Sequence, residues 1–316
     1  MKQSTPVSVV HDIVENTFSS QVEEWDMLKN NYEIFNEALS DEILFEKCFW
    51  SAGKILLSYR KASLSANLSA IENGERPCFL CRSARPAEQR SVEWKDYEIL
   101  ANPYPASDLH LTIVCKEHTP QRIVNRITDM AELARMLPEY AIFYNGPKCG
   151  ASAPDHMHFQ AVDLVDVANF NIKREHLIEG PKVGKSRIYL PRPNMTPFGY
   201  FIMDVKTYAD TQPMFERILR TFPDCDDEPM MNVVAFRVPG ATRIVIIPRK
   251  NHRPECYGTG NDQMLVSPAS IEMMGKFITS RREDYDRLDE GAMQEIYNDV
   301  AYTTTEFLEF AKRLSQ

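Results

Sequence analysis

The sequence predicts an α+β fold in which largely antiparallel strands carry packed helices. Three observations favour this class: both ends of the chain have helical periodicity, short β-prone segments separated by turns lie between them, and one strand motif occurs twice. With 316 residues, the chain can bury a large core as one domain or as two halves. Its hydrophobic share of 43% and charged share of 26% are ordinary for a globular protein.

The two ends of the chain are predicted to be helical. Large apolar residues recur at three-, four- and seven-residue steps over residues 8–39, which indicates an amphipathic helix. Residues 270–316 are predicted to be mostly helical, most clearly over 292–314. We therefore place an N-terminal helical segment at residues 1–45.

The middle of the chain is predicted to alternate strands with a helix. Residues 97–121 indicate two short strands around a Pro-rich turn, and residues 140–145 indicate an aromatic strand. Between them, residues 128–137 favour a short helix with Thr128 as its N-cap, ended by Pro138.

One strand motif occurs twice. Residues 111–121 (LTIVCKEHTPQ) and 244–255 (IVIIPRKNHRPE) both have an apolar strand, a basic residue and then His-x-Pro with a polar residue. Each follows a strand and a turn, which predicts a duplication with a period of roughly 134 residues, about a domain's length. The predicted halves are 46–180 and 181–316, and only the first carries an H-x-H motif because no histidine follows His252.

Composition narrows the range of partners and compartments. The net charge of −9 and pI near 5.4 argue against a nucleic-acid or anionic-membrane partner, because either would need a basic surface. The N-terminus lacks the features of a signal peptide, and no run of about 18 apolar residues predicts a membrane span. Seven dispersed cysteines in a chain of this size suggest reduced thiols and a cytoplasmic location. Lys116 and Arg249 are expected at the surface or in ion pairs.

Residues 152–163 (SAPDHMHFQAVD) place His156, His158 and Gln160 at alternate positions. Alternate residues of a strand point to the same face, so these side chains are predicted to line one face while the intervening apolar residues point into the core. One interpretation is a half-buried strand whose histidines are ordinary polar residues. The other is a face that holds a phosphate or a metal.

The loop before this strand favours phosphate. Asn145, Gly146, Gly150 and Ser152 supply small side chains and backbone N–H groups that can form an anion-binding nest. Lys148 in the same loop could neutralise phosphate charge, although a lone lysine in a polar loop is usually just solvated. A neutral imidazole is a competent nucleophile toward phosphorus, since the attack gives a phosphoramidate whose phosphoryl group can be transferred onward.

Residues 145–160 (NGPKCGASAPDHMHFQ) resemble the active-site segment of the histidine-triad superfamily. The H-x-H-x-Q ending is similar to the transferase branch, which includes galactose-1-phosphate uridylyltransferase, diadenosine tetraphosphate phosphorylase and the GDP-hexose phosphorylases. The hydrolase branch normally has a third histidine in place of Gln160. The resemblance implies a duplicated histidine-triad-like domain that forms an intramolecular pseudo-dimer.

The resemblance also implies a reaction. His158 would attack the α-phosphorus of a nucleoside-diphosphate sugar or dinucleoside polyphosphate, and phosphate or a sugar phosphate would then accept the nucleotidyl group. Gln160 would hydrogen-bond the phosphoryl oxygens, with Asn145 and Ser152 nearby. Asn102 could hold the ribose or base, although Asn-Pro is also common in turns. No organic cofactor is implied. The alternatives are a nucleotide-binding protein without catalysis and a histidine-triad hydrolase.

A structural zinc site is the other implication of the resemblance. Cys78 and Cys81 form a C-x-x-C at the end of a Gly/Pro loop, residues 72–81. In the uridylyltransferases, a C-x-x-C, a histidine after the second strand and the first histidine of H-x-H bind zinc. Carried over, the ligands are Cys78, Cys81, His118 and His156, two thiolates and two imidazoles that suit a closed tetrahedral site. A thioredoxin-like redox pair is the alternative, but the Pro-rich entry does not resemble its βαβ context.

Overall fold

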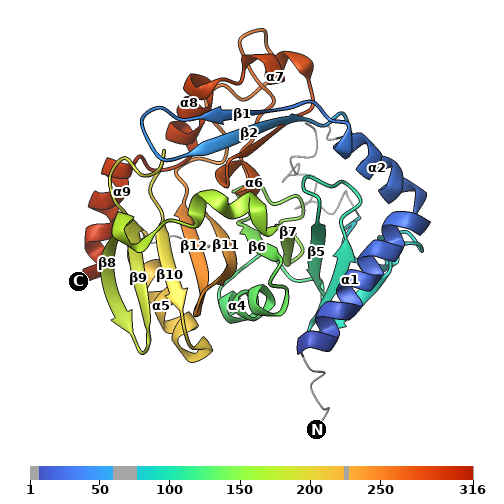
Figure 1. Cartoon of the computed structure of the whole chain (residues 1–316), viewed down its shortest axis with the longest axis horizontal. Coiled ribbons are helices and arrows are strands. Elements are labelled where there is room, and N and C mark those ends of the chain that lie inside the picture. The colour runs from blue at the N-terminus through green and yellow to red at the C-terminus, as the bar shows by residue number, and fades with distance from the viewer. Residues whose placement is uncertain (1–6, 60–76, 224–227, 316) are drawn as a thin grey trace.

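The computed structural model describes residues 7–59, 77–223 and 228–315, and its central element is a ten-stranded sheet (Figure 1). Its strands are β3 (Ser91–Trp94), β4 (Tyr97–Ala101), β5 (His110–Cys115), β6 (Tyr140–Asn145), β7 (His158–Asp163), β8 (Leu177–Val183), β9 (Ser186–Pro191), β10 (Phe201–Val205), β11 (Met231–Val238) and β12 (Ala241–Pro248). The spatial order is β3-β4-β5-β7-β6-β11-β12-β10-β9-β8, and every neighbouring pair is antiparallel. The predicted α+β class with a largely antiparallel sheet is confirmed.

Helices cover one face of this sheet. They are α1 (Val7–Glu24), α2 (Asp26–Asn36), α4 (Ile127–Met136), α5 (Thr211–Leu219) and α9 (Thr304–Ala311), and α4 and α5 lie side by side beneath the strands in Figure 1. The single helix predicted over residues 8–39 is wrong, because Trp25 adopts an extended conformation between α1 and α2 and buries its indole in the core. The predicted N-cap Thr128 is also wrong: α4 begins at Ile127, and Arg126 precedes it.

A second layer covers the other face. It contains a smaller sheet of β1 (Ser40–Leu44), β2 (Ser51–Leu56) and β13 (Lys276–Thr279), and the helices α6 (Ser270–Met273), α7 (Arg282–Arg287) and α8 (Glu290–Val300). The C-terminal region is mostly helical, as predicted, although β13 interrupts its helices and pairs in parallel with β2. An aromatic cluster joins the layers: the Trp50 ring centroid lies 5.4 Å from that of Phe198 and 6.2 Å from that of Tyr297.

Short 3₁₀ helices lie in the connections. They are η2 (Arg82–Ala84), η3 (Leu164–Phe170), η4 (Arg174–His176), η5 (Tyr208–Asp210) and η6 (Lys312–Ser315). The predicted strand–turn at residues 231–242 is the β11–β12 hairpin, whose two-residue turn places Gly240 at φ +77°. Residues 72–76 of the predicted Gly/Pro loop lie outside the described part of the chain.

The large sheet is internally symmetric in its connections. The chain runs β3-β4-β5-α4-β6-β7 and then β8-β9-β10-α5-β11-β12, and the two sets meet where β6 pairs with β11. The two segments 111–121 and 244–255 are therefore not equivalent, and the predicted period of the duplication is wrong. The first segment lies on β5, which corresponds in topology to β10, whereas the second lies on β12, which corresponds to β7. The structural repeat is about 90 residues, since β6 begins at 140 and β11 at 231. The predicted boundary after residue 180 falls within β8, and the division at 45, 180 and 316 stays a prediction.

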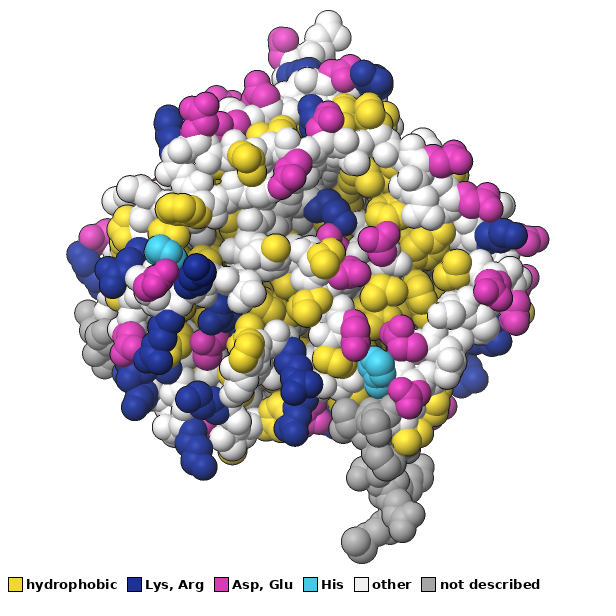
Figure 2. All heavy atoms as spheres, viewed as in Figure 1, with side chains coloured by type: hydrophobic (Ala, Val, Ile, Leu, Met, Phe, Trp, Pro, Cys, Tyr) yellow, Lys and Arg dark blue, Asp and Glu magenta, His cyan; other side chains and the backbone are white. Residues whose placement is uncertain are grey.

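The surface has mixed charge. On the face in Figure 2, acidic and basic side chains are interspersed, and the face is hollowed near its centre. Across the described residues, no helix combines the length and the apolar character that a membrane crossing requires.

Candidate active site

The predicted reactive face lies where β7 begins, on the side of the large sheet that the second layer covers. β7 starts at His158, so His156 lies just before the strand rather than inside it. Strand-like hydrogen bonds nevertheless continue, since Met157 donates to Thr119 O at 2.7 Å and accepts from Cys115 N at 2.9 Å. The predicted alternation is therefore preserved at the backbone, and Met157 is buried in the helix-covered core.

His158 presents an unprotonated ring nitrogen. Its Nδ1 lies 2.8 Å from the carbonyl oxygen of His156, and a carbonyl only accepts, so Nδ1 carries the proton of the neutral ring. Nε2 then has a free lone pair, and no group in the described part of the chain hydrogen-bonds to it. Burial lowers the pKa of His158 to about 4, which keeps the imidazole neutral near pH 7. A neutral imidazole with a free Nε2 is the form that attacks phosphorus.

The side chain of Gln121 bridges the end of β6 and the start of β7 through hydrogen bonds. Its side-chain oxygen accepts from the His158 N–H at 2.8 Å, and its side-chain nitrogen donates to His158 O and Asn145 O, both at 3.0 Å. The side chain thus satisfies backbone groups of both β6 and β7 and is fully buried. Gln121 lies in the sequence motif at 111–121, but its insertion between two strands depends on register and was not predicted.

The loop between β6 and β7 packs closely against the second half. A Cβ on Gly150, which has φ +93°, would lie 2.4 Å from the Ala269 Cβ, and one on Gly146 would lie 2.8 Å from Met231 O. Contacts this short exclude side chains at both positions. The glycines therefore allow the predicted nest loop to lie directly on the C-terminal half.

The structure brings some of the predicted ligand-binding residues together. Asn145 is buried at the end of β6 beside the start of β7, whereas Ser152 is partly buried and Lys148 is exposed. Asn102 stabilises its own turn, because its side-chain oxygen accepts from Tyr104 N at 3.0 Å. The ligand-binding roles of these residues, and of Gly150, stay predictions.

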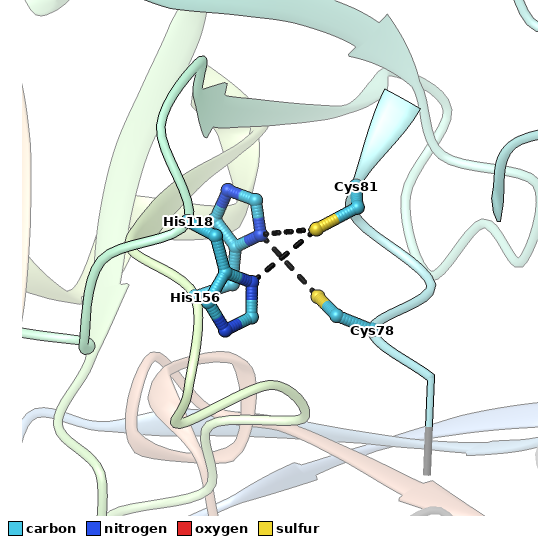
Figure 3. Close-up of side chains that lie close together, drawn as sticks. All are labelled: Cys78, Cys81, His118 and His156. Carbon is cyan, nitrogen blue, oxygen red and sulfur yellow. Dashed lines mark hydrogen bonds between the residues drawn. The ribbon is translucent and has the colours of Figure 1, made fainter. Parts of the chain in front are cut away.

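Cys78, Cys81, His118 and His156 form one compact cluster (Figure 3). Their ligand atoms all lie within 4.8 Å of one another. The His156 Nδ1 is 3.3 Å from the Cys78 Sγ and 3.6 Å from the Cys81 Sγ, and the His118 Nδ1 is 3.3 Å from the Cys81 Sγ. Ordinary zinc–sulfur and zinc–nitrogen bonds at a tetrahedral angle would separate S and N by about 3.6 Å, so the spacing fits such an ion.

The surroundings of the cluster favour metal binding. His156 Nε2 lies 2.8 Å from Cys115 O and donates to it, which turns the unprotonated Nδ1 toward the two sulfur atoms. Burial, reinforced by the neighbouring Cys78, raises the pKa of the Cys81 thiol. A divalent cation between the sulfurs would reverse this effect and stabilise both thiolates.

Neighbouring elements position these four ligands. His118 follows β5 and His156 precedes β7, and these strands are paired neighbours in the sheet. The C-x-x-C turn is held against β4 because Arg85 donates to Leu80 O and to Glu98, both at 2.8 Å. The cluster therefore joins a loop to the end of the sheet that carries His158.

Three buried polar residues near the site were not predicted from the sequence. His110 on β5 contacts Gln160, and Asn232 on β11 contacts Asn145. Arg249 was expected at the surface or in an ion pair, but it is 4% exposed and its hydrogen bonds go to uncharged oxygens in the described residues. Polar residues at alternate positions of β5 could have indicated His110 from the sequence. The contacts of Asn232 and Arg249 could not be predicted, because they depend on how β6 and β11 pair.

The fold is similar to that of solved structures of an Ap4A phosphorylase. Yeast Ap4A phosphorylase Apa2 matches with a TM-score of 0.63 at 14% identity, over 93% of this chain and 97% of that chain. Its complex with AMP matches with a TM-score of 0.58 at 16% identity, over 93% and 96% of the two chains. Its complex with Ap4A gives a TM-score of 0.61 at 15% identity, over 94% and 98%.

Two family models match separate parts of the chain. Residues 17–163 match the family described as "Domain of unknown function (DUF4922)", and residues 231–316 match "GDPGP1-like, C-terminal domain". No curated protein sequence matches the chain. The predicted resemblance to the nucleotidyltransferase and phosphorylase branch is confirmed by the fold together with the C-terminal match.

Proposed function

We propose that the chain is a nucleotidyltransferase or phosphorylase that works through a covalent nucleotidyl-His158. Its substrate is a nucleoside-diphosphate sugar or a dinucleoside polyphosphate, and its acceptor is phosphate or a sugar phosphate. The observation that carries the proposal is the state of His158: a buried, neutral imidazole whose Nδ1 is engaged and whose Nε2 is free. Similarity in fold to an Ap4A phosphorylase and the GDPGP1-like match support this class of reaction.

The reaction has two transfers at one phosphorus atom. In the first, the His158 Nε2 forms a bond to the α-phosphorus, and the bond from that phosphorus to the leaving oxygen breaks to release a sugar 1-phosphate or a nucleotide. In the second, an oxygen of the acceptor phosphate bonds to the same phosphorus and the N–P bond breaks. The proton stays on Nδ1 throughout, where His156 O stabilises the positive charge that develops on the ring.

Gln160 and Asn145 provide the amide groups that stabilise the phosphoryl oxygens in this scheme. Gln160 is two residues beyond His158 on the same face of β7. Donors aimed at oxygens that gain charge are commonly the largest electrostatic contribution to such a reaction. Gln160 in place of a third histidine also favours transfer over hydrolysis.

We also propose that Cys78, Cys81, His118 and His156 hold a structural zinc ion. The four ligands close the coordination sphere, so the ion would support the strand end rather than bind substrate. When bound, zinc would contribute folding free energy and fix the His156 ring.

Substitution of the nucleophile tests the mechanism. His158→Ala should lower the transfer rate at least about 10²-fold while the protein still folds, because the substitution removes the proposed nucleophile. The matched control is His176→Ala, which removes a partly exposed imidazole outside the site and should leave the rate unchanged. A His158→Ala protein with wild-type turnover would rule out the proposed nucleophile.

Covalent trapping separates transfer from binding alone. A brief incubation with α-phosphate-labelled nucleotide sugars or dinucleoside polyphosphates should leave an acid-labile label on the wild-type protein and none on His158→Ala. A panel of UDP-, GDP- and ADP-sugars, with and without phosphate, identifies the base and the acceptor through thermal shifts. Thermal stabilisation without any label would instead indicate a nucleotide-binding protein.

A further inference from the structure

Two side-chain amides flank His158, and each has its oxygen held by donors from elsewhere in the fold. Gln160 follows on β7, and Asn145 lies close to His158 because Gln121 Nε2 donates to the backbone oxygens of both residues, each at 3.0 Å. We propose that His110 and Asn232 are positioning residues that fix these two carboxamides as hydrogen-bond donors to the phosphoryl oxygens of the nucleotide. The inference rests on the proposed function, because this phosphoryl group is the one that His158 attacks.

Each carboxamide is held by a chain of hydrogen bonds, which we call a relay. The first relay begins at a backbone amide. The Ala106 N–H donates to His110 Nδ1 at 3.1 Å, and a backbone N–H can only donate, so the neutral ring carries its proton on Nε2. That N–H donates to the Gln160 Oε1 at 3.0 Å. Asn102 Nδ2 also lies 3.3 Å from His110 Nε2, but it donates to Thr112 Oγ1 at 3.1 Å, and the Asn102 oxygen accepts from Tyr104 N. The oxygen of Gln160 is therefore the acceptor for the ring N–H. Gln160 therefore turns its oxygen to His110 and its NH₂ group away, and no described residue accepts from that nitrogen.

The second relay begins at a guanidinium group. Arg249 Nη1 donates to Asn232 Oδ1 at 2.6 Å, and Asn232 Nδ2 donates to Asn145 Oδ1 and to Cys149 O, both at 2.9 Å. The Ser270 N–H also donates to Asn145 Oδ1, at 2.8 Å. Two donors thus define the oxygen of Asn145, and its NH₂ group has no acceptor among the residues that the structure describes.

Burial gives these orientations energetic weight. His110 and Asn232 are fully buried, so a reversed amide would set N–H against N–H where water cannot compensate. The two relays hold the oxygens of Gln160 and Asn145, which leaves their NH₂ groups without an acceptor among the described residues, on the face of the sheet that carries His158. Anionic phosphoryl oxygens match such donors, whereas a protonated or hydroxyl group would lack an acceptor. The second half has no reactive histidine, yet it supplies Asn232 and Arg249 to the site.

A double-mutant cycle tests the first relay. Gln160→Ala should lower the rate of His158 labelling about 10²-fold, and His110→Phe should lower it about 10-fold or more, because the freed amide no longer has one orientation. The double variant should be no slower than Gln160→Ala alone, since His110 acts only through Gln160. His110→Gln keeps a donor near the Nε2 position and should recover much of the rate.

The second relay has its own cycle. Asn232→Asp keeps an acceptor for Arg249 but loses the donor to Asn145, so it should slow labelling as Asn145→Ala does, and the double variant should add nothing further. His176→Phe, outside both relays, is the control and should label at the wild-type rate. Multiplicative losses in both double variants would overturn the inference. If His110→Phe does not fold, the labelling rates of His110→Gln and of the Asn232 cycle test the inference instead.

Failure of the proposed function gives a different result. If the wild-type protein never labels, the same cycles are measured on the dissociation constants of AMP, GMP and UMP. Coupled losses of affinity would support the relays although the covalent step is wrong. Independent losses, or no binding of any of the three by the wild-type protein, would overturn them.

Discussion

Gly150 shows how one residue couples the reactive loop to the rest of the chain. It has φ +93°, and its Cα lies against Ala269 so closely that a methyl group there would overlap that residue. Gly240 also has a positive φ, but nothing lies within 4 Å of the position of its missing Cβ. Both positions therefore have a φ angle that disfavours a side chain, and they differ in what an added Cβ would contact.

The pair makes a matched test. Gly240→Ala should lower the free energy of unfolding by about 1 kcal/mol through strain. Gly150→Ala should cost about 1–3 kcal/mol more and should also slow nucleotidyl transfer, because the loop must move away from Ala269. Denaturant unfolding and the labelling rate measure both effects. Equal losses of unfolding free energy in the two variants would show that the contact with Ala269 does not affect stability.

At the residue scale, the family resemblance assigned different roles to His156, His158 and Gln160, and those roles stay predictions. The structure places His156 in the Cys/His cluster and the other two residues on β7. The orientation of the Gln160 carboxamide depends on its contact with His110. That contact follows from the register in which β5 and β7 pair. Local spacing carries no information about that register.

At the element scale, the metal cluster connects the C-x-x-C turn to the ends of β5 and β7. The family resemblance gave the four residues whose ligand atoms the fold brings within 4.8 Å of one another. Other elements were predicted less well. The helix at 8–39 breaks at Trp25 because burial of an indole outweighs helical propensity there, and β13 forms because β2 offers it a strand edge.

Removal of one thiolate tests the cluster. The purified protein should contain about one zinc ion per chain, because the donor set forms a single closed site. Cys78→Ser should lose the metal and at least about 3 kcal/mol of stability, since the ion binds only the folded chain. Elemental analysis and chemical denaturation measure the two quantities. Cys256→Ser, outside the cluster, should keep the metal, and a metal-free, fully stable wild-type protein would refute the site.

At the scale of the whole molecule, the two halves share their cores. β6 pairs with β11 across the middle of the sheet, and β2 near the N-terminus pairs with β13 near the C-terminus. Both large hydrophobic clusters contain residues from each half. The duplication was predicted in kind by the repeated motif and the family resemblance together. Its true period was not, because the motif that repeats in sequence lies on strands with different places in the sheet.

Shared cores predict one cooperative unfolding transition rather than two. Phe198 is fully buried, and its ring centroid lies 5.4 Å from that of Trp50 and 4.9 Å from that of Tyr297, so it joins segments from across the chain. Phe198→Ala should lower the free energy of unfolding by about 3–5 kcal/mol and move the whole transition as a unit. Phe49→Ala is the control, because that ring is 76% exposed and its loss should cost less than about 0.5 kcal/mol. Calorimetry should give equal calorimetric and van't Hoff enthalpies for both variants, whereas a Phe198→Ala profile that splits in two would mean that the halves fold independently.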